Sequence, residues 1–413
     1  MRHLIIGSGP AGVVAAETLR KADPAAEITM LCGEAGPPYS RMAIPYLLRG
    51  DIPEAGTHLR KDADHYARLR IQLVQASAKA VDTAARTVDV GGRGLSYDRL
   101  LIATGSRPSR ERIPGIDLPG VQACWTLDDA RAILAQARPG ARIVQMGAGF
   151  VGCIIMEGLL SRGVDLTILV RSGYMVRRMM NATASDMLRR WCEAKGVKIL
   201  THTQPTGLTS EGGVLRVALA DGRVLPADIY LSAVGVDPNL DFLAGSSIEV
   251  AQGIVVDDNL QSSVPGVYAA GDVAEATDCL TGKRQLNAIQ PNAVEQGRIA
   301  ALNMAGRAAR FKGSFVFNVL TTLGLVSSSF GEWQGVPGGE SAEVLDGARY
   351  RYLNLQFEGD RLVGANTVGF TDHVGALRGL IEGRVRLGAW KQRLMADPTL
   401  IMQAYLAAAH SVV

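Results

Sequence analysis

The chain has 413 residues, of which 47% are hydrophobic and 20% are charged. This length is enough for two or three domains. The 43 basic and 40 acidic residues leave a net charge of only +3, which gives no reason to expect nucleic acid or an anionic membrane as a partner. No apolar run reaches membrane-spanning length, and Met1-Arg2-His3 before the first expected strand leaves no room for a signal peptide. We therefore expect a cytoplasmic protein without membrane contact.

A glycine-rich turn lies between an apolar strand and a helix at the start of the chain. Residues 4–6 predict the strand, and the turn reads Gly7-Ser8-Gly9-Pro10-Ala11-Gly12. Gly7 permits the turn, Gly9 leaves room for a pyrophosphate, and Gly12 lets the helix lie against the strand. The helix N-terminus would then present N–H groups and a positive dipole end to the phosphates. A second strand over residues 27–31 follows at βαβ spacing, so a glycine turn without a ligand is the weaker interpretation.

A second unit of the same kind begins in the middle of the chain. A strand is predicted over residues 142–146, a helix to about residue 162 and another strand over 165–170, and the turn reads Gly147-Ala148-Gly149-Phe150-Val151-Gly152. Pro108, Pro114 and Pro119 mark a linker before it. Two such units in one chain predict two nucleotide ligands.

Other segments add buried strands that end in turns. One ends at Ala103-Thr104-Gly105, one covers residues 230–234, and one, over 266–270, ends at Gly271 and the carboxylate of Asp272. Residues 71–93 predict short strands, a short exposed helix is expected toward residue 50, and a longer one over 290–304. Strands over 351–357 and 361–368, followed by helices from about residue 373, predict a separate small α+β domain.

The cysteines and histidines give no sign of a metal or thiol centre. The five cysteines occur singly and the six histidines lack metal-ligand spacing. We therefore expect buried structural thiols and no metal site.

With these four motifs in order, the chain resembles the FAD- and NAD(P)H-dependent pyridine nucleotide-disulfide oxidoreductases. Pro38-Tyr39-Ser40-Arg41 is similar to the branch of rubredoxin, ferredoxin and nitrite reductases, which also includes the FAD electron-transfer subunit of phenylglyoxylate dehydrogenase. The resemblance implies an α/β fold with two Rossmann-like domains and a small α+β interface domain. The expected domains are FAD-binding (1–112 and 245–312), NAD(P)-binding (113–244) and C-terminal interface or dimerisation (313–413).

The resemblance also implies residues that bind FAD. Glu34 would accept a hydrogen bond from the adenine-side ribose, Arg41 would reach the ribityl or phosphate region, and Asp272 would bind a ribityl hydroxyl. The helix after Pro291 would direct its N-terminus at the flavin O2/N1 edge. The remaining implied contacts are Gly7, Gly9, Pro10, Ala11, Gly12, Thr104, Gly105 and Gly271. Asp272 as a helix cap and Arg41 as a solvated loop residue remain open alternatives.

The nicotinamide dinucleotide would lie on the second turn, against Gly147, Gly149, Phe150, Val151 and Gly152. NAD-specific relatives commonly end the following strand with an acid that binds the ribose 2′-hydroxyl. Here Val170 ends it, and Arg171 and Arg177 follow six residues apart, a spacing similar to the arginine pair of glutathione reductases. Two guanidinium groups suit a 2′-phosphate, which favours NADPH. Gly152 is instead the NAD-typical residue at the third position, so NADH stays open.

The flavin side departs from the thiol-dependent relatives. Met42 stands where they carry a redox cysteine, and a thioether cannot act as a thiolate. Tyr46 and Ile154 replace a lysine–glutamate pair of many ferredoxin reductases, which predicts a less polar flavin N5 side. Glu157, one helical turn further on, could substitute for that glutamate, although a surface position on the helix is the better expectation.

The sequence thus predicts an FAD-dependent NAD(P)H oxidoreductase that passes electrons to or from an iron–sulfur carrier or partner subunit. No side chain is needed as an acid, base or nucleophile, so no catalytic residue is named. An NAD(P)H oxidase or peroxidase, and a non-catalytic FAD-binding adaptor subunit, are the alternatives. Either a homodimer or a subunit of a larger complex is expected; the acceptor and the direction of electron flow stay open.

Overall fold

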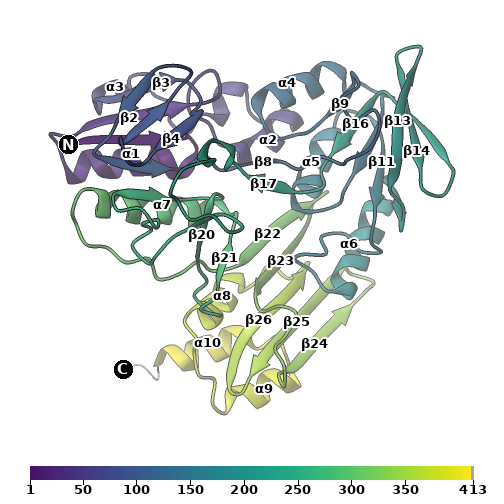
Figure 1. The fold of residues 1–413 in the computed structure, drawn as a ribbon. Helices are drawn as coiled ribbons and strands as arrows, with labels where there is room; N and C mark the ends of the chain where they lie inside the picture. Colours follow the sequence, from purple (N-terminus) through teal and green to yellow (C-terminus); the bar gives the residue numbers. More distant parts are fainter. Residues whose placement is uncertain (411–413) are drawn as a thin grey trace. The chain divides into compact units, whose positions relative to one another are not determined.

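The computed structural model describes residues 1–410, which form two compact units (Figure 1). Each unit is built from separate stretches of chain. The first contains Met1–Ala43, Ile52–Arg107 and Val236–Phe315. The second contains Ile44–Asp51, Pro108–Gly235 and the chain from Val316 onward.

The first unit is built on a five-stranded parallel sheet in the order β19-β7-β1-β2-β3. The predicted strand–helix–strand at the start of the chain is confirmed, with Ile5 paired to both Met30 and Leu101. The strands and the two long helices are β1 (Arg2–Ile6), β2 (Glu27–Cys32), β3 (Ile71–Gln75), β7 (Arg99–Ile102), β19 (Val267–Ala269), α1 (Pro10–Ala22) and α7 (Gln290–Met304).

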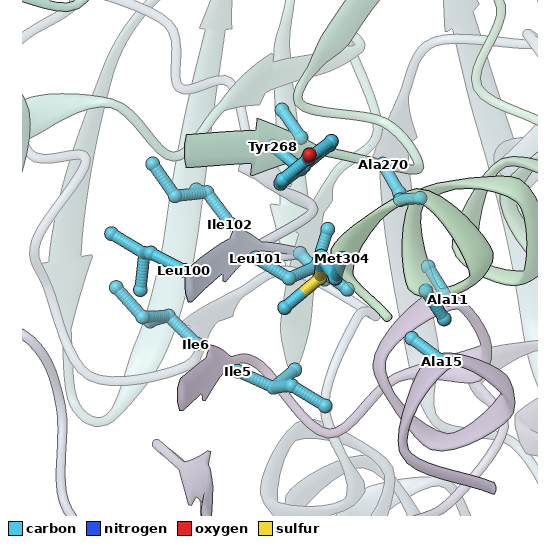
Figure 2. Close-up of a cluster of buried hydrophobic side chains, with 14 of the residues drawn as sticks. Ile5, Ile6, Ala11, Ala15, Leu100, Leu101, Ile102, Tyr268, Ala270 and Met304 are labelled. Carbon is cyan, nitrogen blue, oxygen red and sulfur yellow. The ribbon is translucent and has the colours of Figure 1, made fainter. Parts of the chain in front are cut away.

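The core of this unit lies between the sheet and helices α1 and α7. Figure 2 shows apolar side chains of β1 and β7 together with Ala11 and Ala15 of α1 and Met304 of α7. The central strands β1 and β7 end in continuous apolar runs, Leu4–Ile6 and Leu100–Ile102, as is typical of parallel sheets that helices cover. The two helices come very close, since a Cβ built on Gly297 of α7 would lie 2.3 Å from the carbonyl oxygen of Ala11. This contact fixes the N-terminal end of α1 against α7.

Smaller elements complete the first unit. They include two three-stranded sheets, in the orders β4-β5-β6 and β18-β20-β21, and a β8–β17 pair. The bounds are β4 (Ala80–Asp82), β5 (Thr87–Asp89), β6 (Gly94–Ser96), β8 (Ser106–Pro108), β17 (Val236–Pro238), β18 (Ile254–Val255), β20 (Ala274–Thr277), β21 (Arg284–Leu286), α3 (His65–Arg68) and the 3-10 helices Arg41–Ala43, Glu54–Thr57 and Asp241–Leu243.

The second unit repeats the parallel design, with strand order β12-β11-β10-β16-β9. The predicted strands over residues 142–146 and 165–170 are confirmed. The elements are β9 (Val121–Gln122), α4 (Leu127–Gln136), β10 (Arg142–Met146), α5 (Phe150–Leu160), β11 (Asp165–Val170), α6 (Ala182–Ala194), β12 (Lys198–Thr201) and β16 (Ile229–Ser232), with an antiparallel sheet of β13 (Pro205–Glu211), β14 (Val214–Leu219) and β15 (Val224–Ala227).

Helix α2 (Ile44–Arg49) differs from the expectation of an exposed helix. Ile44 is only 3% exposed and Leu48 is fully buried. The reason is close packing on α5, where a Cβ built on Gly158 would lie 2.8 Å from the Cβ of Leu48. Only one face of α2, with Tyr46, remains exposed.

The last hundred residues form the predicted α+β segment. Its antiparallel sheet has the order β22-β23-β26-β25-β24, and the expected hairpin of β25 and β26 is confirmed. Asn366 of β26 accepts from the backbone N–H of Asn181 and donates to the carbonyl of Met179, at 2.9 Å each, which fastens the start of α6 beside this sheet (Figure 1). The elements are β22 (Phe317–Thr322), β23 (Leu325–Gly331), β24 (Glu340–Asp346), β25 (Arg351–Glu358), β26 (Arg361–Val368), α8 (Val374–Glu382), α9 (Trp390–Ala396) and α10 (Ile401–His410). Within residues 1–410, no helix is long and apolar enough to span a bilayer.

Candidate functional site

The first glycine turn has three glycines in three different environments. Gly7 has a φ of +111°, and a Cβ built there would lie 2.2 Å from the carbonyl oxygen of Ala103. A Cβ on Gly12 would lie 2.0 Å from the carbonyl oxygen of Gly7, whereas one on Gly9 would meet no atom within 4 Å. Gly7 and Gly12 are therefore required by the packing of the protein itself. Gly9 instead faces open space at the N-terminus of α1.

The second turn repeats this geometry in the other unit. Gly147 has a φ of +103°, with a built Cβ 2.2 Å from the carbonyl oxygen of Ala233. A Cβ on Gly152 would lie 2.6 Å from the carbonyl oxygen of Gly147, and one on Gly149 would again meet nothing. Neither Gly9 nor Gly149 offers a side-chain cap to the helix it precedes. Both helices therefore present uncapped N–H groups to the open side of a turn, an arrangement that suits a pyrophosphate.

Three more of the predicted positions meet at the carboxyl edge of the first sheet. Gly271, with a φ of +82°, follows β19 and donates its backbone N–H to Gln296 of α7 at 2.8 Å. Thr104 and Asn239 bind each other twice, because the Thr104 hydroxyl donates to the Asn239 carbonyl at 3.1 Å and the Asn239 amide donates back at 2.9 Å. Gly105 also accepts from the backbone N–H of Asn239. Gln296 and Asn239 thus shape the edge, although no sequence motif pointed to them.

Asp272 lies at the same edge, and its carboxylate faces a neutral donor. The hydroxyl of Ser106 donates to Asp272 at 2.7 Å. Burial raises the pKa of Asp272 above its usual range, while the Ser106 hydrogen bond and the charge of Arg41 oppose that rise. Asp272 is not the N-cap of any helix in residues 1–410, so the helix-cap alternative is wrong. Ser106 was not predicted, because its spacing from Asp272 along the chain carries no signal.

Arg41 and Glu34 are paired with each other. The guanidinium of Arg41 donates to Glu34 at 2.5 Å and to the hydroxyl of Tyr39 at 3.1 Å. The Tyr39 hydroxyl also donates to Glu34. Arg41 is therefore part of a three-residue network, and its contact with FAD stays a prediction. Glu34 keeps about two fifths of its side chain exposed (39%) and remains open to a further donor.

The loop after the first unit's second strand carries no thiol. Met42 is 46% exposed, and four of the five cysteines are buried, with Cys279 at intermediate exposure. Glu157 forms an ion pair with Arg49 of α2 at 3.0 Å. This pair supports the surface interpretation of Glu157, because its charge is already balanced by a neighbouring helix. No cluster of metal-binding side chains is found in the described part of the chain.

The loop between β11 and α6 carries the predicted arginines. Arg171 and Arg177 are both exposed, and neither forms an ion pair with another residue of the described chain. Arg177 lines a pocket of about 380 Å³ near the start of α6, together with Tyr174, Met180, Asn181, Ala182, Trp333, Gln334 and Gln356. Both guanidinium groups are therefore available to an anion.

The residues present fit two dinucleotides. In each turn the middle glycine, Gly9 or Gly149, leaves open a space that a Cβ would occupy. This space lies next to the uncapped N-terminus of a helix of at least eleven residues. The first turn lies in the same unit as the buried carboxylate of Asp272, and the second lies in the same unit as unpaired arginines. The chain can thus hold two ligands that each contain a pyrophosphate but differ in the groups attached to it.

Comparison with known proteins agrees with this geometry. Residues 1–301 match the family model described as pyridine nucleotide-disulphide oxidoreductase, and the chain belongs to this family. It is similar to the NADH-dependent phenylglyoxylate dehydrogenase subunit epsilon of Aromatoleum evansii, with 33% identity over 97% of this chain and 96% of that protein. It is also 34% identical to the probable ferredoxin reductase CtmF of Castellaniella defragrans, over 74% of this chain and 76% of that protein.

Solved structures show the same fold. The covalent putidaredoxin reductase–putidaredoxin complex superposes with a TM-score of 0.91 at 25% identity, covering 99% of each chain. An engineered water-forming NADPH oxidase, bound to NADPH and made by five substitutions in the NADH oxidase of Lactobacillus brevis, gives 0.88 at 23% identity over the full length of both. The predicted fold class is confirmed. The protein is an oxidoreductase of the FAD- and NAD(P)H-dependent kind, as the sequence predicted.

Proposed function

We propose that the protein moves electrons between a nicotinamide dinucleotide and an iron–sulfur carrier by way of FAD. The observation that supports this proposal best is the pair of glycine turns with the same geometry, together with Met42 at the position where thiol-dependent relatives carry a redox cysteine. We assign FAD to residues 1–112 and 245–312, the nicotinamide dinucleotide to residues 113–244, and a partner or dimer interface to residues 313–413. The two bound rings supply the hydride and electron chemistry. The protein supplies position and electrostatics.

Each group at the first site has a physical task in this proposal. The uncapped N–H groups of α1 bind the pyrophosphate, and Gly9 lets it approach the backbone. Asp272 accepts from a ribityl hydroxyl, and Ser106 holds its carboxylate in place. Glu34 accepts from the ribose at the adenine end, while the hydrogen bond from Arg41 holds its carboxylate in place. No side chain is required to move a proton, so we name no catalytic residue.

The proposed partner is a one-electron iron–sulfur protein or subunit. Support comes from relatives named as a ferredoxin reductase and as a subunit of phenylglyoxylate dehydrogenase. Anaerobic titration of the flavin-loaded protein with NADPH should bleach the flavin without a thiolate–flavin band. Added ferredoxin or rubredoxin should then be reduced faster than oxygen is consumed. A flavin that stays oxidised with both NADPH and NADH contradicts the proposal, and fast turnover on oxygen alone favours the oxidase alternative.

We propose NADPH as the preferred nicotinamide dinucleotide. In the engineered NADPH oxidase, a glycine became alanine and, eighteen positions later, an aspartate became alanine. The next two residues became arginine and serine, and a proline five positions further became arginine. This chain has Val170, Arg171 and Ser172 in succession and Arg177 five positions on, with Gly152 eighteen positions before Val170. The correspondence is in residue types and spacing, and only the glycine keeps the NADH-type choice.

Arginine substitutions test this preference. Arg177→Ala and Arg171→Ala should each raise the KM for NADPH by about 10-fold or more, because a charge-assisted hydrogen bond contributes about 1.5–3 kcal/mol. The KM for NADH should change little. Arg178→Ala, which removes an exposed arginine next to Arg177, is the matched control. Equal use of NADH and NADPH by the unaltered protein would refute the preference.

A second candidate is a subunit that works only inside a larger complex. The similarity to the phenylglyoxylate dehydrogenase subunit over 97% of this chain favours it. Native purification separates the two candidates. A homodimer with full carrier-reductase activity rules out the obligatory subunit, whereas stable association with iron–sulfur subunits rules out the free reductase.

A further inference from the structure

His202 lies beside the arginine loop although it is thirty-one residues from Arg171 in the sequence. Strands β11 and β12 are neighbours, with Val170 paired to Thr201. His202 follows Thr201 directly, and its backbone N–H donates to the carbonyl of Ser172 at 3.5 Å. The carboxyl ends of the two parallel strands therefore place His202 against the loop that begins at Arg171.

The His202 imidazole occupies a space that only glycine leaves free. A Cβ built on Gly173 would lie 2.9 Å from Nε2 and 3.0 Å from Cε1 of His202. His202 itself is exposed and has a φ of +54°, a left-handed conformation that costs energy for a residue other than glycine. Within residues 1–410, no hydrogen bond engages its ring. The ring is thus held at the loop but left without a protein partner.

The loop itself is held in a strained shape. Val176 is buried and has a φ of +43°, a strong outlier for a β-branched residue. Its backbone N–H donates to the carbonyl of Ala148, inside the second glycine turn, at 2.7 Å. Such strain persists only where surrounding contacts enforce it, and it is common at ligand sites. The hydrogen bond ties the position of Arg177, the next residue, to the turn proposed to hold the pyrophosphate.

We propose that His202 is a third group that recognises the 2′-phosphate of NADPH, together with Arg171 and Arg177. This inference rests on the proposed preference for NADPH. A phosphate has three charged acceptor oxygens that can take donors from several directions, whereas a 2′-hydroxyl has a single neutral oxygen. An imidazole N–H supplies one such donor from the β12 side of the loop, and Gly173 provides the room for it. His202 is therefore a specificity-determining residue rather than a catalytic one.

Two small nucleotides isolate this effect at equilibrium. Adenosine 2′,5′-bisphosphate carries the 2′-phosphate, and adenosine 5′-monophosphate lacks it. His202→Ala should weaken binding of the bisphosphate about 10- to 100-fold, the effect of one lost hydrogen bond to a charged group, and leave the monophosphate unchanged. Gln204→Ala, at an exposed position two residues further on, should change neither.

Gly173→Ala provides an independent test without removing the imidazole. The added methyl group would displace the His202 ring, so this variant should show the same selective loss. In the double variant with His202→Ala the methyl group should add no further loss, because nothing remains to be displaced. Calorimetric titration of all four proteins gives the complete cycle.

The outcomes separate the inference from the function on which it rests. If the unaltered protein prefers the bisphosphate and His202→Ala keeps that preference, His202 has no role in recognition and the inference is wrong. If His202→Ala weakens both nucleotides equally, its role is structural and the inference is also wrong. If the unaltered protein binds both nucleotides equally, the proposed choice of NADPH itself fails.

Discussion

Replacing Gly9 by alanine separates the binding role of the first turn from its folding role. A Cβ at this position meets no protein atom within 4 Å, and Gly9 has a φ of −74°, which alanine adopts freely. The methyl group would instead occupy the space through which we propose that the FAD pyrophosphate reaches the N-terminus of α1. We expect a protein that folds normally and binds FAD poorly.

The magnitudes follow from the two environments. Lower entropy of the unfolded chain favours alanine by about 0.4–1 kcal/mol, and the weaker N-cap costs a similar amount, about 0.5–1 kcal/mol. The free energy of unfolding of the apoprotein should therefore change by less than about 1 kcal/mol. Displacement of the pyrophosphate would weaken one or two charge-assisted hydrogen bonds, a loss of about 2–4 kcal/mol. That corresponds to a Kd for FAD that is about 30- to 1,000-fold higher.

Flavin fluorescence titration of the apoprotein measures the Kd, and urea unfolding of the same apoprotein measures stability. Unfolding of the loaded protein is unsuitable, because weaker binding lowers its apparent stability by mass action. Gly149→Ala, the equivalent position in the second turn, is the control and should weaken NADPH while sparing FAD. Two results would refute this reasoning. One is a free energy of unfolding of the Gly9→Ala apoprotein that falls by more than about 2 kcal/mol. The other is an unchanged Kd for FAD, which would mean that the pyrophosphate does not use the space at Gly9.

Three further predictions concern packing, titration and thiols. Gly152→Ala should lower the free energy of unfolding by about 1–3 kcal/mol in urea, since its Cβ would lie 2.6 Å from the Gly147 carbonyl oxygen; unchanged stability would contradict the close packing. Burial lowers the pKa of His3 from 6.5 to about 4, so the unfolded chain binds this proton more readily and stability falls as the pH drops from about 6.5 toward 4. The variant His3→Leu should lose up to about 3 kcal/mol less unfolding free energy over this pH range. Urea unfolding at several pH values measures this difference. The same dependence of stability on pH in both proteins would refute the prediction. Four of the five cysteines are buried, and Cys279→Ser removes the fifth, which is partly exposed. Treatment of the Cys279→Ser protein with iodoacetamide at pH 8 should therefore leave NADPH-dependent flavin reduction intact. Inactivation of the treated variant would support a thiol mechanism.

The sequence predicted most of the elements that position the two turns. Apolar strands followed by glycine turns are a local signal, and β10, β11 and α7 end within two residues of their predicted bounds. The reason is physical, since Gly7 and Gly12 are required by contacts with chain segments inside the same βαβ unit or its sheet. Local patterning and long-range packing agree at these positions.

Pairings between distant segments were beyond the reach of the sequence. The hydrogen bond from Ser106 to Asp272 joins residues 166 positions apart, and neither residue type predicts the other. The same holds for the contact of His202 with Gly173, which depends on the order of strands in the sheet. The burial of α2 depends on Gly158 of another helix, whereas its own sequence predicted an exposed helix. Proximity in the fold, rather than propensity, decided each of these cases.

The two glycine turns also explain where nucleotide identity is read. In the proposed assignment both turns present the same geometry to a pyrophosphate, which FAD and the nicotinamide dinucleotides all contain, so the turns themselves do not discriminate between the two ligands. Residues beyond the following strand can discriminate between the adenosine ends of the two ligands, because there the two units differ. The first has Glu34, a carboxylate suited to a ribose hydroxyl, and the second has Arg171 after the apolar Val170. Exchange of charge at these strand ends, with the turns left intact, is therefore the change that would alter ligand choice without altering the fold.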